Sequence, residues 1–268
     1  MRIGKREFDL KNKTYIMGIL NVTPDSFSDG GKWNERDNAL KHVEEMIKDG
    51  ADIIDIGGES TRPGHIQVSD EEEITRVTPI IEEIGKRFEV PISIDTYKAV
   101  VAEAALQAGA HLVNDVWGFK YDDKIAKVAA SYNVPCCLMH NKEQATYSNF
   151  LQDVLTELQE SVNIALEAGV AADKIIVDPG VGFGKTYEQN LEIINRLECL
   201  HELKVPILLG TSRKSVIGLT LDLPASERVE GTLATTVIGV IKGSTFVRVH
   251  DVKENKRVIQ MTEAILGR

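Results

Sequence analysis

The amino-acid sequence predicts a single α/β domain, a (βα)8 barrel of the TIM type, and three observations support that prediction. Eight short apolar runs alternate with segments of helical period, as expected for parallel strands joined by crossover helices. Each run passes at its carboxyl end into polar or ionisable residues, which a barrel would gather on one rim. The length of 268 residues suits a fold that typically needs about 250. We therefore expect one domain over 1–268, with the barrel proper at about 14–268.

Most of the eight expected strands begin beside Gly, Ala or Pro. They are TYIMGIL (14–20), ADIIDIGG (51–58), VPISI (90–94), HLV (111–113), VPCCLM (134–139), KIIV (174–177), VPILLG (205–210) and TFV (245–247). An open doubly wound sheet alternates in the same way. Asp55, inside an apolar run, favours the barrel, because an inward-facing acid fits the functional end of a barrel better than the core of an open sheet. Residues 1–13 precede the first strand and are expected to form a small cap or hairpin over the opposite mouth.

Eight helices are expected between and after these strands. Three have a capping residue, namely 35–49 with Asn34, 70–87 with the capping box Ser69 and Glu72, and 97–108 with Thr96. The other five follow from apolar periodicity, at about 122–132, 147–168, 187–203, 225–242 and 252–266. Asp122 and Asp123 are best interpreted as cap or turn residues.

Composition and charge exclude several classes of function. Hydrophobic residues make up 43% and charged residues 27% of the chain, close to the globular average. The net charge of −10 opposes binding to a phosphate backbone, so we expect no nucleic-acid partner. The charged start lacks an apolar signal region and no apolar stretch is long enough for a bilayer, so we expect no membrane association. Cys136, Cys137 and Cys199 form no CxxC motif, which indicates reduced thiols in a cytoplasmic protein.

Two loops that follow predicted strands are candidates for ligand binding. The first, NVTPDSFSDGG at 21–31, is longer than most strand-to-helix connections and is typical of a lid or binding loop. The second, GGESTRPG at 57–64, offers backbone amides, hydroxyls and Arg62, and such a loop can close over an anion. Basic residues at several strand exits predict a local positive cluster within an acidic molecule, and they are Arg62, Arg213, Lys214, Arg248 and His250.

The segments MGILNVTPDSFSDGG and DIIDIGGESTRPG resemble the paired signatures of the dihydropteroate synthases, the folate-pathway enzymes inhibited by sulfonamides. The resemblance continues through SIDT, LVNDVWG, IIVDPGVGFGK, LLGTSRKS and VRVHDV. It implies a pterin-binding (βα)8 barrel, usually a homodimer. It also implies a transferase that joins hydroxymethyl-dihydropterin pyrophosphate to p-aminobenzoate and releases pyrophosphate.

The resemblance implies a role for each candidate site residue. The expected pterin-binding residues are Asp95, Asn114, Asp178 and Lys214. The expected pyrophosphate-binding residues are Thr61, Arg62, Arg248 and His250. The expected p-aminobenzoate-binding residues are Phe27, Thr61, Pro63, Phe183, Lys214 and Ser215. The expected catalytic residues are Asp95, Lys214 and Arg248, and Asn21 is the expected contact for Mg2+.

Residue chemistry is consistent with these roles. A pterin presents an amino group and a ring N–H side by side, and a carboxylate such as that of Asp178 can accept both. One carboxamide oxygen from Asn21 is a weak ligand, so Mg2+ is expected to bind mainly to pyrophosphate oxygens and water. The attacking aromatic amine is a weak nucleophile. We therefore expect pyrophosphate to leave first or early, giving a cation that nearby carboxylates stabilise, with no protein nucleophile.

Three alternatives remain at this point. A P-loop enzyme is suggested by PGVGFGKT, but Pro179 stands where that motif needs glycine, so Phe183 and Lys185 are better interpreted as parts of a loop over the pterin. Pterin-dependent methyltransferases use a similar barrel, although they need neither the Arg248 and His250 pair nor the long first loop. A catalytically silent pterin-binding protein is the third. The small residues of GTLATTVIGVIKG indicate either packing on the barrel or a dimer face.

Overall fold

The computed structural model describes residues 1–22, 31–59 and 67–268, with 31–35 described by their backbone alone. Its main sheet has eight parallel strands in the order β8-β7-β6-β5-β4-β3-β10-β9. They are β3 Tyr15–Asn21, β4 Ile53–Gly57, β5 Ile92–Asp95, β6 Leu112–Asp115, β7 Cys136–Met139, β8 Ile175–Asp178, β9 Leu208–Leu209 and β10 Phe246–Val249. A parallel bridge between Val177 and Ile207 joins the two edges, and Val177 N donates to Pro206 O at 3.0 Å. The predicted barrel is confirmed.

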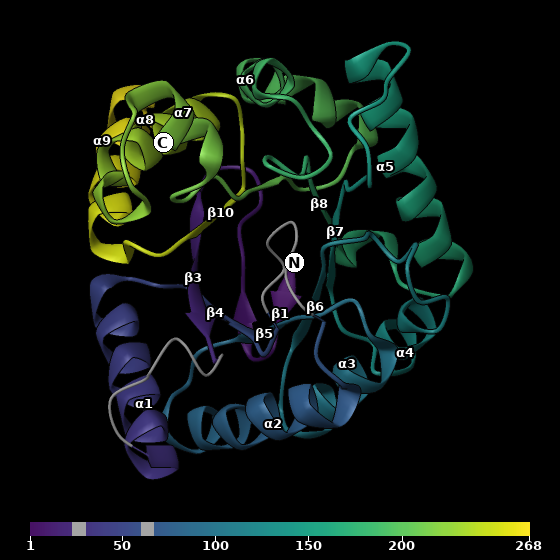
Figure 1. Ribbon diagram of the computed structural model, residues 1–268, viewed down its shortest axis with the longest axis vertical. Coiled ribbons are helices and arrows are strands. Elements are labelled where there is room, and N and C mark those ends of the chain that lie inside the picture. The colour runs from purple at the N-terminus through teal and green to yellow at the C-terminus, as the bar shows by residue number, and fades with distance from the viewer. Residues whose placement is uncertain (23–30, 60–66) are drawn as a thin grey trace.

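Helices surround the strands (Figure 1). They are α1 Gly31–Asp49, α2 Asp70–Arg87, α3 Ala99–Gln107, α4 Ile125–Ser131, α5 Phe150–Glu167, α6 Tyr187–Asn195, α7 Ser215–Leu221, α8 Val229–Ile241 and α9 Val252–Leu266. The described part of the chain also contains the short 3-10 helices η2 Ala172–Lys174, η3 Leu197–Leu203 and η4 Ala225–Glu227. Among the described residues, no helix has the combination of length and apolar character that crossing a bilayer requires.

Three helices begin two or three residues later than predicted, and for the first of them a hydrogen bond shows why. Thr96 does not cap α3, because the helix begins at Ala99 and the backbone N–H of Ala99 donates to Asp122 Oδ2 at 2.9 Å. Asp122 therefore acts as a cap from another part of the chain, and α4 begins only at Ile125. The helix predicted over 147–168 similarly begins at Phe150.

Only half of the predicted capping box forms at α2. Ser69 Oγ accepts from Glu72 N at 3.2 Å, but the Glu72 carboxylate binds Arg76 one turn further on. The predicted cap Asn34 lies outside the described side chains, and α1 starts earlier than predicted, at Gly31.

The helix predicted over 187–203 is broken at Arg196, where α6 gives way to the 3-10 helix η3. A 3-10 helix has three residues per turn, so Leu197, Leu200 and Leu203 align on one side. Leu197 and Leu200 are buried and Leu203 packs against the core, which accounts for the tighter winding. The prediction also missed the short helix α7 and placed the start of α8 four residues too early.

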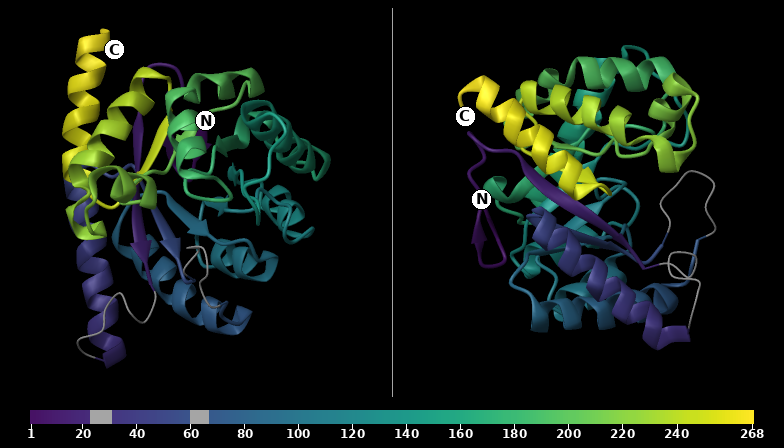
Figure 2. Two further views of the ribbon diagram at one scale, coloured as in Figure 1. Left: turned by 45° about the horizontal axis from the view of Figure 1, so that its top comes forward. Right: turned by 90° about the vertical axis from the view of Figure 1, so that its left-hand side faces the viewer.

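The chain start forms the expected hairpin over the mouth of the barrel at the amino ends of the strands. Strands β1 Arg2–Ile3 and β2 Arg6–Glu7 pair antiparallel. Phe8, which follows them, packs on Tyr15 with ring centroids 4.7 Å apart and on Phe246 at 5.8 Å. Both partners begin their strands, so the hairpin closes the end away from the strand tips. Figure 2 shows this hairpin beside the N label.

Side chains of each strand alternate between the barrel interior and the helix layer. In β4, Ile53 belongs to the interior cluster under the hairpin, whereas Ile54 and Ile56 pack against the helices. In β10, Phe246 faces the interior and Val247 the helix layer. Because the side-chain period of a strand is two, the next interior positions towards the carboxyl ends are Asp55 and Arg248.

Candidate active site

The interior of the barrel changes from apolar to charged along its strands. The lower layer under the hairpin contains Met17, Ile53, Leu112, Cys137, Ile176 and Phe246. Two residues further along several of these strands come Asp55, Asn114, Asp178 and Arg248. Because strand side chains alternate between the two faces, acids, an amide and a cation all lie at one rim, as the sequence predicted for the carboxyl ends of the strands.

Arg248 bridges two acids at the centre of this rim. Its Nε donates to Asp55 Oδ2 and its Nη2 to Asp95 Oδ2, each at 2.6 Å. Asn114 Nδ2 donates to the same Asp55 oxygen at 3.2 Å. The Arg248 side chain keeps 19% of its surface exposed, so part of the guanidinium faces the open end of the barrel. Asp55 was predicted to point inward but was not assigned a role in the site, and the structure adds it.

The two acids each keep one buried oxygen available. Asp55 Oδ1 and Asp95 Oδ1 have no hydrogen-bond partner among the described residues. Burial raises the pKa of Asp95 to about 7, although the charge of Arg248 acts in the opposite direction. Burial lowers the pKa of Arg248, but Asp55 and Asp95 outweigh it and raise that pKa above its ordinary value. A donor or a cationic ligand would satisfy the two carboxylate oxygens.

Asp178 and Lys214 face the same space as Arg248. A Cβ atom added to Gly210 would lie 3.4 Å from Asp178 Oδ2, 3.8 Å from Lys214 Nζ and 3.8 Å from Arg248 Cβ. Three side chains from different strand ends therefore surround a point that glycine leaves open. Burial raises the pKa of Asp178, and Lys214 opposes that shift. Burial lowers the pKa of Lys214 to about 8, and Asp178 opposes it.

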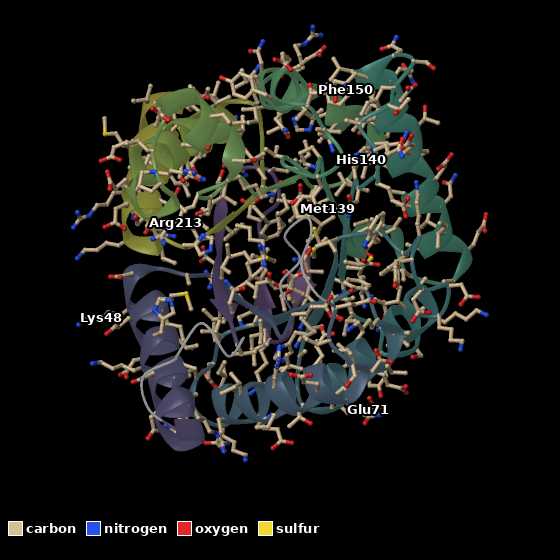
Figure 3. All side chains as sticks on the ribbon, viewed as in Figure 1. Lys48, Glu71, Met139, His140, Phe150 and Arg213 are labelled. Carbon is tan, nitrogen blue, oxygen red and sulfur yellow. The ribbon has the colours of Figure 1, made fainter. Side chains whose placement is uncertain are left out.

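Phe183 and Lys214 form one wall of this space. Lys214 Nζ donates to the carbonyl of Val181 at 2.6 Å and lies 4.8 Å from the centroid of the Phe183 ring. Phe183 also packs in an apolar cluster with Tyr97, Val116, Met139 and Trp117. Val116 and Met139 were not predicted as site residues. Their only sequence signal is their position at the end of a predicted strand, for Met139, or shortly after one, for Val116 (Figure 3 labels Met139).

Asn21 lies at the same rim, at the end of β3. A Cβ atom on Gly57 would lie 3.7 Å from Asp95 Oδ2 and 3.8 Å from Asn21 Oδ1, so the Asn21 carboxamide and the Asp95 carboxylate border one gap. The hard oxygen donor of Asn21 fits Mg2+. Among the described residues, no group of three His, Cys, Asp or Glu side chains could hold a metal.

The predicted positive cluster forms only in part. His250 Nδ1 lies 2.9 Å from Ser212 Oγ, and His250 N donates to the same hydroxyl at 3.1 Å, which fixes the imidazole beside β10. Arg213 instead binds Asp251, with Nε 3.0 Å from Oδ2, and lies by the α7–α9 helices (Figure 3). The charge of Arg213 is therefore used in this ion pair and does not add to the positive cluster. Ser215 is exposed at the first turn of α7, next to Lys214.

Four predicted site residues lie outside the described residues: Phe27, Thr61, Arg62 and Pro63. Two other polar strand exits face away from the barrel interior. Asp115 accepts the backbone N–H groups of Trp117 and Phe119 at 2.7 and 2.8 Å. His140 Nε2 lies 3.0 Å from Glu157 Oε2 of α5.

The sequence matches known proteins over almost its full length. Residues 17–250 match the family described as pterin binding enzyme. The chain is 64% identical over 269 residues to the dihydropteroate synthase of Clostridium beijerinckii, a match that covers 100% of both proteins. It is 58% identical to the dihydropteroate synthase of Bacillus subtilis over 96% of this chain and 90% of the relative.

Solved structures of similar proteins share the fold. A dihydropteroate synthase from Clostridium difficile, crystallised in the presence of pteroic acid, superposes with a TM-score of 0.96 at 51% identity over 98% of this chain and 100% of that one. The Yersinia pestis enzyme in complex with a sulfonamide drug gives 0.92 at 40% identity, covering 100% and 98%. The Xanthomonas albilineans enzyme with 4-aminobenzoic acid gives 0.91 at 39% identity, covering 96% and 94%. The chain therefore belongs to the dihydropteroate synthases, within the family of pterin binding enzymes.

Proposed function

We propose that this dihydropteroate synthase of folate biosynthesis joins hydroxymethyl-dihydropterin pyrophosphate to p-aminobenzoate at the rim described above. The observation that carries the proposal is the position of Arg248. It binds Asp55 and Asp95 on one side and borders the space between Asp178 and Lys214 on the other. Acids that can hold a heterocycle and cations that can hold a departing anion thus meet in one place.

The pterin ring is proposed to bind Asp95, Asn114, Asp178 and Lys214. Asp178 Oδ1 already accepts Gly180 N at 2.7 Å, but each carboxylate oxygen has two lone pairs, so both oxygens can still accept from the pterin. Asn114 uses its Nδ2 on Asp55, which leaves its carbonyl oxygen as an acceptor for a ring N–H.

The pyrophosphate is proposed to bind Arg248 and His250, with Thr61 and Arg62. The hydrogen bonds of Arg248 to Asp55 and Asp95 use Nε and Nη2, so Nη1 is the nitrogen that can reach a phosphate oxygen. The p-aminobenzoate is proposed to lie against Phe183, Lys214 and Ser215, with Phe27, Thr61 and Pro63. Lys214 Nζ lies over the Phe183 ring, and this supports the proposal because a benzoate can use both a cation and an aromatic face.

The proposed reaction separates bond breaking from bond making. The bond from the pterin methylene carbon to the pyrophosphate oxygen breaks first, and its electron pair leaves with the pyrophosphate. The two available carboxylate oxygens, Asp55 Oδ1 and Asp95 Oδ1, stabilise the cation that remains. The p-aminobenzoate nitrogen then bonds to that carbon and loses a proton. Direct displacement would instead be supported by a rate that rises linearly with the basicity of the amine and does not change when the pterin is made less electron-rich.

Mg2+ is proposed as the cofactor. Asn21 Oδ1 would hold it together with pyrophosphate oxygens and water, and bound Mg2+ would offset the negative charge of the pyrophosphate. The residues fit such a role because Asn21 borders the same gap as Asp95.

The chain is also proposed to form a homodimer in the cytoplasm. Large apolar side chains are exposed on α7, α8 and α9, among them Leu219, Ile241, Met261 and Ile265, which are 54–72% exposed. A second copy would cover them. One face of α8 packs on the barrel at Gly239, where a Cβ would lie 2.7 Å from Leu209. The small residues of this helix therefore serve packing on that face, and the opposite face is the one proposed for the dimer. Free cysteines suit a reducing compartment.

Pyrophosphate release tests the function. With both substrates and Mg2+, the purified chain is expected to release one pyrophosphate for each dihydropteroate formed. A methyltransferase would release none, and a silent binding protein would bind the pterin without turnover. Sedimentation of the same preparation tests the dimer.

A further inference from the structure

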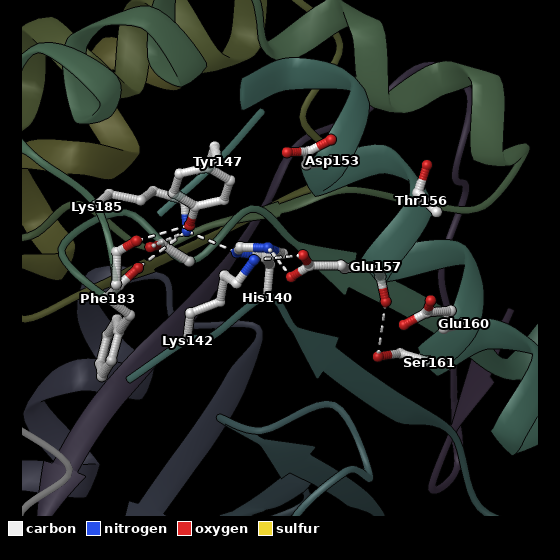
Figure 4. Close-up of polar contacts among 12 residues, drawn as sticks. His140, Lys142, Tyr147, Asp153, Thr156, Glu157, Glu160, Ser161, Phe183 and Lys185 are labelled. Atoms are coloured by element: carbon white, nitrogen blue, oxygen red, sulfur yellow. Dashed lines mark hydrogen bonds and ion pairs between the residues drawn. The ribbon is translucent and has the colours of Figure 1, made fainter. Parts of the chain in front are cut away.

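Lys185, which the sequence predicts only as part of a loop over the pterin, occupies a site built from three acceptors. Its Nζ lies 2.8 Å from His140 Nδ1, 3.0 Å from the carbonyl of Gly180 and 3.0 Å from the carbonyl of Phe183. Figure 4 shows these contacts converging on the ammonium. An ammonium has three donors, so the three acceptors match the protonated form and would leave a neutral amine with one donor too few.

The segment 179–185 is the glycine-rich loop that carries Phe183, and it packs directly on the backbone after β7. Gly180 and Gly184 have φ values of +69° and +53°, and a Cβ on Gly180 would lie 1.8 Å from His140 O. On Gly184 it would lie 2.4 Å from Lys142 O. Such close approach is possible only without side chains, so the loop has one tightly defined position.

Two ammonium groups together bind three carbonyls of this loop. Lys185 binds those of Gly180 and Phe183, and Lys214 binds that of Val181, which lies between them. Lys214 is the proposed ligand of both substrates. The position of its ammonium therefore depends on the carbonyl of Val181, whose place is set by the carbonyls that Lys185 holds.

His140 is prepared to accept from Lys185 by a carboxylate on α5. Glu157 Oε2 lies 3.0 Å from His140 Nε2, and because a carboxylate only accepts, the proton lies on Nε2 and Nδ1 is left as the acceptor. Glu157 is itself held by Lys142, whose Nζ donates to Oε1 at 2.6 Å. Burial, and then the charge of Lys185, lowers the pKa of His140 to about 2, which keeps the ring neutral.

We propose that Lys185 is a positioning residue for the dihydropteroate synthase reaction. Its ammonium, oriented through His140 by Glu157, holds the loop that sets Phe183 and Lys214 against the substrates. This inference rests on the proposed roles of Phe183 and Lys214.

The proposal implies a pH dependence that belongs to Lys185. Burial lowers its pKa to about 7, so the charged form is present below that pH and is lost as the pH rises through it. The charged and titratable groups that face it are His140 and Lys142 after β7, Glu157 on α5, Asp178 on β8 and Lys214 before α7. Asp178 and Glu157 favour the charged form, and the two lysines oppose it.

The test compares Lys185→Met with the unaltered chain from pH 6 to pH 9. The ratio of their kcat/KM values for p-aminobenzoate reports on Lys185, because every other titratable group is present in both proteins. We expect a ratio of about tenfold at pH 6, expressed mainly in KM, that becomes smaller at pH 9, where the neutral amine has one donor fewer for its three acceptors. A ratio that stays constant with pH, a ratio of one throughout, or a loss confined to kcat would overturn the proposal.

Glu157→Gln provides a test outside the loop, with Glu160→Gln as its matched control. Both residues lie on α5, but Glu160 binds Lys120 and does not contact His140. A glutamine amide at 157 can donate to Nε2 and so release the tautomer of His140. We expect Glu157→Gln to raise the KM about threefold and Glu160→Gln to leave it unchanged. Equal KM values for the two variants would refute the orientation of His140 by Glu157. This comparison tests the positioning role of Lys185 if Lys185→Met does not fold.

Lys214→Met separates failure of this inference from failure of the proposed function. If Lys214→Met loses activity while Lys185→Met does not, the site stands and the positioning role is wrong. If both variants keep full activity, the proposed site itself is wrong.

Discussion

Arg248 and Asp55 stand 193 positions apart in the chain, and Nε of the arginine donates to Oδ2 of the aspartate at 2.6 Å. The bond joins β10 to β4 across the barrel rim. It places a cation among acids, and the balance of charge there leads to two predictions, on Arg248 and Asp95. Two more predictions concern the buried Asp115 and the close-packed Gly180.

Arg248→Gln should lower the free energy of unfolding by about 2–3 kcal/mol. That is less than the roughly 3–5 kcal/mol for breaking a fully buried pair, because 19% of the arginine side chain is exposed. Urea unfolding measures the change. Arg6 gives the control, because its side chain is 43% exposed and its partner Asp52 also has Lys256 within 3.6 Å. Arg6→Gln should therefore cost no more than about 1 kcal/mol. If the Arg248→Gln/Asp55→Asn double variant is no more stable than Arg248→Gln, an uncompensated carboxylate is not the cause.

Asp95 should make the fold less stable as the pH rises from about 4 to about 7. Its pKa is about 7 in the folded chain, against 3.8 for the ordinary group. The folded state therefore holds a proton that the unfolded state has lost. Asp95→Asn should remove this slope, and stability curves at several pH values measure it. Asp115, whose pKa burial also raises to about 7, remains in both proteins and contributes to the residual slope, as do Asp178 and Glu73, whose pKa values burial also raises. Activity should change in the opposite sense, because stabilising a cation requires ionised Asp95.

Asp115→Ala should destabilise the fold by about 2–3 kcal/mol while leaving substrate KM values nearly unchanged. Its carboxylate accepts the backbone N–H groups of Trp117 and Phe119, and alanine would leave both without that acceptor. Thermal unfolding with steady-state kinetics on the same sample measures both quantities. A large rise in KM without loss of stability would place Asp115 in the binding site instead.

Gly180→Ala should prevent correct formation of the loop, with a cost above about 3 kcal/mol, because its Cβ would overlap His140 O. Gly85→Ala is the matched control. Gly85 lies inside α2 with nothing within 4 Å of an added Cβ, so alanine there should stabilise the fold by about 0.5–1 kcal/mol. Equal stabilities for the two variants, compared by urea unfolding, would refute the packing argument.

Strand positions were predictable because they depend on local pattern. The apolar runs around Ile54, Val113 and Val247 all form strands, and α9 has the predicted bounds of Val252–Leu266. Asp55 was predicted to face inward and does so. Helix ends were less predictable, since the cap of α3 comes from Asp122, which is distant in sequence from the helix start.

The sequence could name candidate residues for the site, but it could not decide which of two adjacent polar residues faces the barrel interior. Asn114 and Asp115 are adjacent polar exits, yet only Asn114 points inward, because successive strand residues face opposite sides. Lys214 borders the central space, whereas Arg213 beside it binds Asp251. The contact of Lys185 with His140 joins two loops, and the sequence of neither loop indicates it.

The sequence alone determined the strand and helix alternation, the barrel and the chemical character of its rim, because these follow from periodicity and from the order of residues along the chain. Only the tertiary structure decided which charges pair with one another and which face the central space. Pairing depends on distances between strands far apart in sequence, and the pKa values of Asp95 and Lys214 depend on burial that exists only after the barrel has closed.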